Sequence, residues 1–185
     1  MAVNLNKTPA ATINLQKAAP SLTNIKAVLW WTASAGAAQF DLDVSAFILK
    51  ADSKLIDENH FVFYNNLSAG GVTKSADERA GGTEELLINI PSIPATASEV
   101  SIIVTIFDAD VRGQTFGLIQ EAGIKILNAD TNEEIAFYDL DETFSAETAV
   151  QVGSFCKTAE GFTFQGVGAG YTGLGLGDFF AGYSN

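Results

Sequence analysis

The sequence predicts an all-β fold, a two-sheet β-sandwich of mostly antiparallel strands with one or two short helices. About ten short apolar or alternating segments are separated by turn signals, which is typical of a sandwich. Thirteen phenylalanines stand against four prolines, and aromatic side chains pack well on pleated surfaces. Hydrophobic residues make up 47% of the chain and charged residues 17%, so the apolar content is sufficient for a sizeable core. We expect a single domain over residues 1–185, with residues 1–12 as an N-terminal extension.

The expected strands follow one another along the whole chain. Residues 40–50 are the clearest case, because Asp41 and Asp43 fall on the face opposite Leu42 and Val44. Several strands are apolar on both faces, so we expect loops or the C-terminal segment to cover some of them. The other expected strands are residues 13–15, 27–31, 61–64, 86–90, 101–108, 123–127, 134–140, 150–156 and 162–167, the last two forming a hairpin; helical structure is expected only at residues 113–122 and 178–181.

The charge of the chain limits its partners. Acidic residues outnumber basic ones by 22 to 10, which gives a net charge of -12. Binding to nucleic acid or to an anionic membrane surface requires a basic patch, so neither partner is expected. A bound divalent cation would relieve the repulsion within such a surface locally, although the charge alone is explained equally simply by solubility.

Several features favour a cytoplasmic location. Cys156 is the one cysteine, so no disulfide forms within the chain. The first residues lack the charged and then apolar pattern of a signal peptide. No apolar run reaches the length of about 18 residues that a transmembrane helix needs.

Acidic residues gather in three separate stretches. Asp41 and Asp43 share one face of a strand, where two like charges about 7 Å apart repel unless a cation or water intervenes. Calcium takes six to eight oxygen ligands, often carboxylates on loops and strand ends, so a meeting of the three stretches at the rim of the sandwich would favour a calcium site. Taken separately, each stretch more often marks a solvated strand end or loop. The second stretch holds Asp77, Glu78, Glu84 and Glu85, and the third holds Asp108 and Asp110.

Two familiar binding motifs fit this chain poorly. The segment that starts at Asp41 is not an EF-hand loop, because Ala46 stands where that loop needs glycine and the residues alternate as in a strand. Residues 168–173 match the glycine pattern of a dinucleotide site, but no helix is expected to begin directly at them, and the acid about 20 residues downstream is missing. Neither motif therefore predicts a ligand.

Catalysis is not expected either. His60 is the only histidine and Cys156 has no activating neighbour in the sequence, so neither a zinc site nor a catalytic triad is indicated. Asp41 and Asp43 have a spacing that a glycosidase uses, but neighbours on one strand face point the same way instead of flanking a bond. We expect a protein that is not an enzyme and has no catalytic residues.

Several motifs of this chain occur together in one known family. Their order and spacing agree over residues 13–183, which makes the set more specific than any single motif. The chain resembles the TerD-like family of bacterial tellurium-resistance and stress proteins. The matching segments are residues 40–49 (the DLD-x-SAF-x-L strand), 61–66 (FVFYNN), 104–109 (VTI-x-DA), 112–117 (RGQ-x-FG), 147–149 and 168–171.

The resemblance implies a β-sandwich that binds calcium through acidic loops at one end, in proteins associated with tellurite resistance, general stress and phage defence. Residues 76–85 are shorter than the usual family loop, which reads close to GDNRTGEGEGDDE, and hold fewer acids and glycines. The resemblance implies two calcium positions, and the shorter loop is expected to weaken or remove one of them. By position, the implied calcium ligands are Asp41, Asp43, Asp77, Glu84, Glu85 and Asp108.

Two functions from different classes follow from these observations. The first is a calcium-binding stress-response domain associated with tellurite resistance, which acts through other stress-response proteins or through further copies of itself. The alternative, suggested by the shortened loop, is a metal-free scaffold that self-associates. Membrane insertion is expected in neither case.

Overall fold

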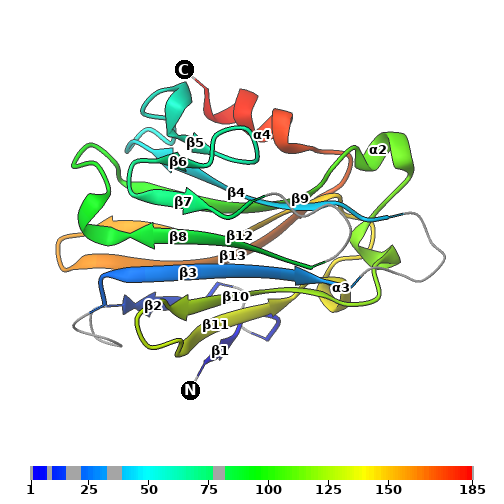
Figure 1. Cartoon of the computed structure of the whole chain (residues 1–185), viewed down its shortest axis with the longest axis horizontal. Helices are drawn as coiled ribbons and strands as arrows, with labels where there is room; N and C mark the ends of the chain where they lie inside the picture. The colour runs from blue at the N-terminus through cyan, green and yellow to red at the C-terminus, as the bar shows by residue number, and fades with distance from the viewer. Residues whose placement is uncertain (1, 8–9, 16–21, 33–38, 77–81, 185) are drawn as a thin grey trace.

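The computed structural model describes residues 2–7, 10–15, 22–32, 39–76 and 82–184. Two β-sheets pack on each other (Figure 1). Within these residues, one sheet has seven strands in the order β1-β11-β10-β3-β8-β7-β6, and the other has six in the order β2-β13-β12-β9-β4-β5. The strands pair antiparallel except β1 with β11. The predicted sandwich is therefore confirmed.

Each segment expected as a strand overlaps a strand of the structure, and the short strands β6 and β7 were not expected. The segment expected as an N-terminal extension contributes β1, which lies along β11. The first sheet holds β1 (Val3–Asn4), β3 (Asn24–Trp31), β6 (Ser68–Ala69), β7 (Val72–Lys74), β8 (Gly82–Asn89), β10 (Ala122–Asn128) and β11 (Glu134–Asp139). The second holds β2 (Thr12–Asn14), β4 (Leu42–Leu49), β5 (Phe61–Val62), β9 (Glu99–Ile106), β12 (Ala149–Thr158) and β13 (Gly161–Tyr171). The helical elements are η1 (Glu58–His60), η2 (Ile90–Ser92), α2 (Ala109–Arg112), η3 (Phe116–Leu118), α3 (Leu140–Thr143) and α4 (Leu176–Tyr183).

The main core lies between the two sheets. β3 shows why, because its alternate residues Ile25, Ala27, Leu29 and Trp31 are buried while the residues between them are half-exposed. The indole N–H of Trp31 donates a hydrogen bond to the carbonyl oxygen of Phe40 at 3.1 Å, which satisfies its polar atom inside the core.

β4 is buried on both faces. Its predicted alternation is confirmed, with Leu42 and Val44 in the main core, whereas Phe47 belongs to a second apolar cluster on the outer face of its sheet. The helix α4, drawn beside β5 in Figure 1, packs Phe179 into this outer cluster, and the amide of Leu55 donates to the carbonyl oxygen of Tyr183 at 2.8 Å. The expectation that the C-terminal segment covers a sheet face is therefore confirmed.

The helix expected at residues 113–122 is wrong. α2 ends at Arg112, and Gly113 follows it in the left-handed conformation (φ +63°), which commonly terminates helices. Gly117 then passes so close to Ser145 that a Cβ atom would stand 2.6 Å from the Ser145 carbonyl oxygen. Only the single turn η3 forms before β10 begins. The helical turn expected at residues 178–181 lies within α4, and none of the described helices is long and apolar enough to cross a membrane.

Tyr138 gives the core a measurable pH dependence. It is fully buried in β11, and burial raises its pKa from 10.0 to about 12. Because the folded-state pKa lies above the unfolded value, its contribution is complete below pH 10 and is lost as the pH rises through about 12. We expect the free energy of unfolding to fall by about 2 kcal/mol across this window, and Tyr138→Phe to remove that part of the fall. Urea unfolding curves at a series of alkaline pH values compare the two proteins, and identical pH slopes would contradict this assignment.

Candidate functional site

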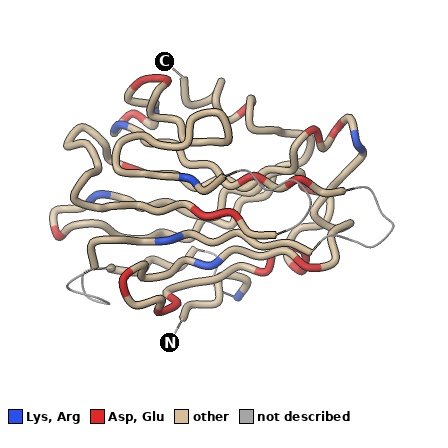
Figure 2. Tube along the Cα trace, in the orientation of Figure 1, with Lys and Arg blue, Asp and Glu red and all other residues tan. Residues whose placement is uncertain are grey.

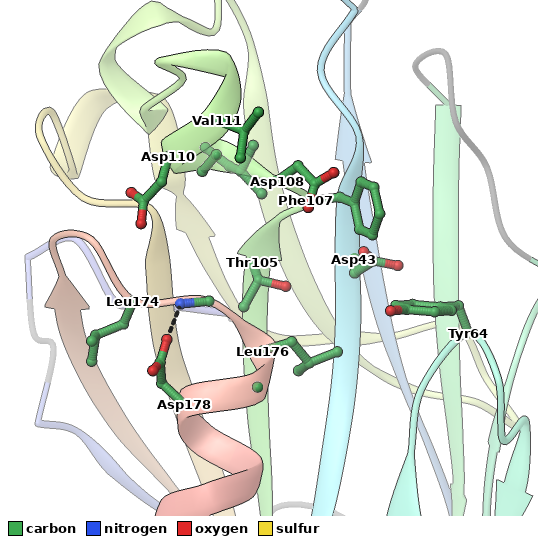
Figure 3. Close-up of a pocket in the computed structure, with 14 residues that line it drawn as sticks. Asp43, Tyr64, Thr105, Phe107, Asp108, Asp110, Val111, Leu174, Leu176 and Asp178 are labelled. Carbon is green, nitrogen blue, oxygen red and sulfur yellow. Dashed lines mark hydrogen bonds between the residues drawn. The ribbon is translucent and has the colours of Figure 1, made fainter.

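Two cavities meet at the end of the sandwich where β4 begins and β9 ends. Asp43, Tyr64 and Phe107 line both, so Asp43 lies at their junction. Acidic residues gather at this end of the molecule, around α2 and the start of β4 (Figure 2). The first cavity, about 350 Å³ in volume, has among its described lining residues the acids Asp43, Asp108, Asp110 and Asp178 (Figure 3). The second, about 330 Å³, is also lined by Gln39, Asp41, Asn65 and Arg112.

The pairing of β4 with β9 explains why two of the acidic stretches meet. The strands run antiparallel, with Asp43 opposite Thr105, and the amide of Phe107 donates to the carbonyl oxygen of Asp41 at 2.8 Å. The first residues of β4 therefore lie beside the last residues of β9. In this way Asp41, Asp43 and Asp108 are brought to one end of the sandwich, Asp41 beside the second cavity and Asp108 beside the first.

Asp43 is the most buried of these acids. Only 3% of its surface is exposed, although it lies on the face of β4 that leads to the outer cluster. Thr105, opposite it on β9, is also buried and lines the first cavity with it. An ionised carboxylate in such a position is costly unless charges or hydrogen bonds compensate it. Of the three acids Asp41, Asp43 and Asp108, Asp43 therefore has the greatest need of such compensation.

Asp108 adopts a conformation that non-glycine residues rarely use. Its φ and ψ angles of 51° and 33° lie in the left-handed region, where asparagine and aspartate are the most tolerated side chains. The turn lets the chain leave β9 and enter α2 at once. The guanidinium carbon of Arg112, at the end of α2, then lies 5.3 Å from the centre of the Phe107 ring. A cationic group thus stands at the rim of the second cavity.

Two acids of the first cavity were absent from the predicted ligand set. Asp110 belongs to an acidic stretch noted in the sequence, but Asp178 was not expected there because nothing in its spacing links it to β4. α4 brings it to the cavity, and its Oδ2 accepts a hydrogen bond from the amide of Gly175 at 2.8 Å (Figure 3). The only sequence signal was the helical turn expected at residues 178–181, and a helical turn does not show which distant segment Asp178 will approach.

Glu84 lies inside the sandwich, in an ion pair. Its Oε1 is 2.6 Å from Nζ of Lys74, and both side chains are fully buried. Its Oε2 accepts a hydrogen bond from the amide of Val44 at 3.0 Å. Glu84 therefore contacts the residue after Asp43 from the opposite sheet, and it does not line either of the two cavities.

Glu85 lies on the other face of β8, since successive residues of a strand point to opposite sides. Its side chain is 44% exposed and its Oε1 is 3.6 Å from Nζ of Lys26. The structure therefore does not bring Glu85 to the cavities. Asp77, also predicted as a ligand, lies outside the described residues.

The lining suits a hard cation in its chemistry. Among the described residues that line the first cavity, Thr105 and Tyr64 carry hydroxyl groups beside the carboxylates, and none is a cysteine or a histidine. Calcium prefers such oxygen ligands. Within the part of the chain that the structure describes, no three His, Cys, Asp or Glu side chains are grouped closely enough to hold a metal ion. The residues thus fit calcium by donor type, while the described carboxylates do not form a closed cage.

The remaining reactive side chains lie elsewhere. Nδ1 of His60 is 2.9 Å from Oδ1 of Asp57, and this hydrogen bond lowers the pKa of the Asp57 carboxyl. Burial and the nearby carboxylate of Glu99 raise the pKa of the Cys156 thiol, which reduces its reactive thiolate form. Neither residue lines the two cavities.

Comparison with known proteins agrees with this fold. The family model of the TerD domain matches residues 1–183. The chain is 39% identical over 180 residues to the tellurium resistance protein TerD of Serratia marcescens, covering 94% of this chain and 93% of that protein. It is 37% identical over 169 residues to general stress protein 16U of Bacillus subtilis, covering 87% and 88%. A crystal structure of a TerD homologue from Streptomyces coelicolor superposes with a TM-score of 0.73 at 20% identity, over 89% of this chain and 100% of that one, and so shares the fold. The chain belongs to the TerD family.

Proposed function

We propose that this chain is a calcium-binding stress-response domain, associated with tellurite resistance, that works in the cytoplasm through partner proteins instead of by catalysis. The observation that carries the proposal is the position of Asp43, a carboxylate only 3% exposed at the junction of two acid-lined cavities. The names of the relatives, tellurium resistance protein TerD and general stress protein 16U, support the biological setting.

A calcium ion at this junction would balance several carboxylates at once. The proposed ligands are Asp41, Asp43 and Asp108, with Asp77 as a further predicted ligand, and the side chains of Asp110 and Asp178 face the same first cavity. Calcium accepts flexible coordination and completes it with water or carbonyl oxygens. Glu84 and Glu85 are left out of this set, because Glu84 is paired with Lys74 inside the sandwich and Glu85 lies on the outer face of β8, and neither lines the two cavities.

A role through partners is favoured over catalysis by the chemistry of the cavities. Asp41 and Asp43 are neighbours on one face of the chain, and glycoside hydrolysis by two carboxylates requires groups that flank the glycosidic bond. The proposed partners are other stress-response proteins or a second copy of the chain. Nucleic acid is not among them, since the net charge is -12.

The proposal is tested by melting the protein in calcium and in chelator. A ligand that binds only the folded state stabilises it in proportion to the logarithm of its concentration. We expect the melting temperature to rise with calcium concentration and to return to the chelator value when calcium is removed. Magnesium at the same concentration serves as the control and is expected to have a smaller effect, because it demands stricter octahedral geometry.

The metal-free scaffold remains the second candidate, and one observation favours it. Within the described residues, the acidic side chains are not grouped into a metal-holding set. In that case calcium leaves the melting curve unchanged, and light scattering shows oligomers in chelator and in calcium alike. The two candidates therefore give opposite results in the calcium melts, and oligomers that form without calcium support the scaffold.

A further inference from the structure

The buried ion pair beneath β4 links three strands from both sheets. Lys74 is on β7 and Glu84 on β8, in the first sheet, and both side chains have no exposed surface. Glu84 reaches across the interior to the amide of Val44 on β4, in the second sheet. Each oxygen of the carboxylate thus has a separate contact: Oε1 with the Lys74 ammonium and Oε2 with the Val44 amide.

The Val44 amide needs this acceptor because β5, the strand at the edge of its sheet, is too short to reach Val44. The amide of Phe107 bonds to the carbonyl of Asp41, so in this antiparallel pair the backbone groups of Asp41 and Asp43 face β9, and those of Val44 face the opposite edge. On that edge, β5 pairs only with Ala46 and Phe47. At Val44 the carboxylate of Glu84 takes the place of a strand carbonyl, and a buried amide without an acceptor would be destabilising.

The hydrogen bond acts on the peptide group that joins Asp43 to Val44. The nitrogen that donates to Glu84 belongs to the peptide plane immediately after Asp43. Holding this plane restricts the backbone of Asp43 and therefore the direction of its side chain at the junction of the two cavities. The ammonium group of Lys74 in turn compensates the buried carboxylate of Glu84, since an isolated buried carboxylate is disfavoured.

We propose that Glu84 is a positioning residue of the calcium site, held by Lys74, and not one of its ligands. This inference rests on the proposed function, because it assigns to Glu84 the task of orienting Asp43 for the cation. Groups that hold a metal ligand from behind typically change metal affinity by about 10–100-fold when they are removed. The predicted ligand role of Glu84 is thereby replaced by a role one hydrogen bond behind the site.

The test compares two double variants that both remove the ion pair. In Lys74→Met with Glu84→Gln, the side-chain carbonyl of residue 84 still accepts from the Val44 amide, whereas in Lys74→Met with Glu84→Leu no acceptor remains. Calcium titrations are carried out far below the melting temperature of each protein. We expect the Gln variant to bind calcium nearly as tightly as the wild type and the Leu variant to bind about 10–100-fold more weakly. Equal affinities of the two variants would overturn the inference.

A second measurement in chelator separates this inference from the proposed function. Hydrogen exchange of the Val44 amide is expected to be slow in the wild type and in the Gln variant, and faster in the Leu variant relative to amides elsewhere in β4. The trans-hydrogen-bond coupling between the Val44 nitrogen and the Glu84 carboxyl carbon reports the contact in the wild type, so the test does not depend on the variants folding. If the wild type lacks the coupling and its Val44 amide exchanges fast, the inference is overturned. If the wild type shows the coupling and slow Val44 exchange but gives no heat with calcium, the proposed function is overturned instead.

Discussion

Replacing Asp43 by asparagine is expected to abolish most of the calcium-dependent rise in melting temperature. Asn is nearly isosteric with Asp but lacks the charge that a cation would balance, and Asp43 is the acid shared by both cavities. Calcium at about a thousand times its dissociation constant stabilises a folded protein by about 4 kcal/mol. For a chain of this size that corresponds to a rise on the order of 10 °C. Calorimetric melts in calcium and in chelator measure the rise for both proteins.

Glu85→Gln is the matched control for this prediction. It removes one negative charge from the same protein, but Glu85 lies on the outer face of β8 beside Lys26 and away from the cavities. We expect Glu85→Gln to keep the full calcium-dependent rise. An Asp43→Asn protein that also kept it would place the cation elsewhere.

Phe47→Ala is expected to lower the free energy of unfolding by about 3–5 kcal/mol, as deletion of a buried aromatic ring usually does. Phe47 is fully buried in the outer cluster, where its ring centre lies 4.4 Å from that of Phe61 and 4.9 Å from that of Tyr183. Loss of the ring removes the ring contact between Phe47 of β4 and Tyr183 of α4. Urea unfolding measures the loss, and hydrogen exchange is expected to be faster throughout α4.

The control for Phe47 is an apolar residue that is not buried. Val111 on α2 is 87% exposed, and Val111→Ala is expected to change stability by less than about 0.5 kcal/mol. If Phe47→Ala were as mild as this control, the outer cluster would not be the attachment of the C-terminal segment.

The predictable part of the fold was the part governed by local alternation. The pattern around Asp43 and Val44 fixed both the strand and its two faces, because a side-chain period of two leaves no other assignment. The failed helix at residues 113–122 had a cause distant in the sequence. The close approach of Gly117 to the backbone of Ser145 constrains that segment, and no local pattern shows which distant segment will lie there.

The candidate site was predictable to the same extent. Acids at the start of β4 and at the end of β9 were expected at one rim, and antiparallel pairing brings Asp41, Asp43 and Asp108 there. The sequence did indicate that Glu84 and Glu85 point to opposite faces of β8. Glu84 shares its strand face with the apolar Leu86 and Ile88 and therefore points inward. The salt bridge to Lys74 required the pairing of β7 with β8, which the sequence alone did not provide.

Isothermal titration of calcium into chelator-treated protein tests directly whether the acids around Asp43 bind calcium. We expect saturable heat with a dissociation constant below about 1 mM, and no heat beyond dilution for Asp43→Asn under the same conditions. A wild-type titration at millimolar calcium that gives only the heat of dilution would contradict this expectation.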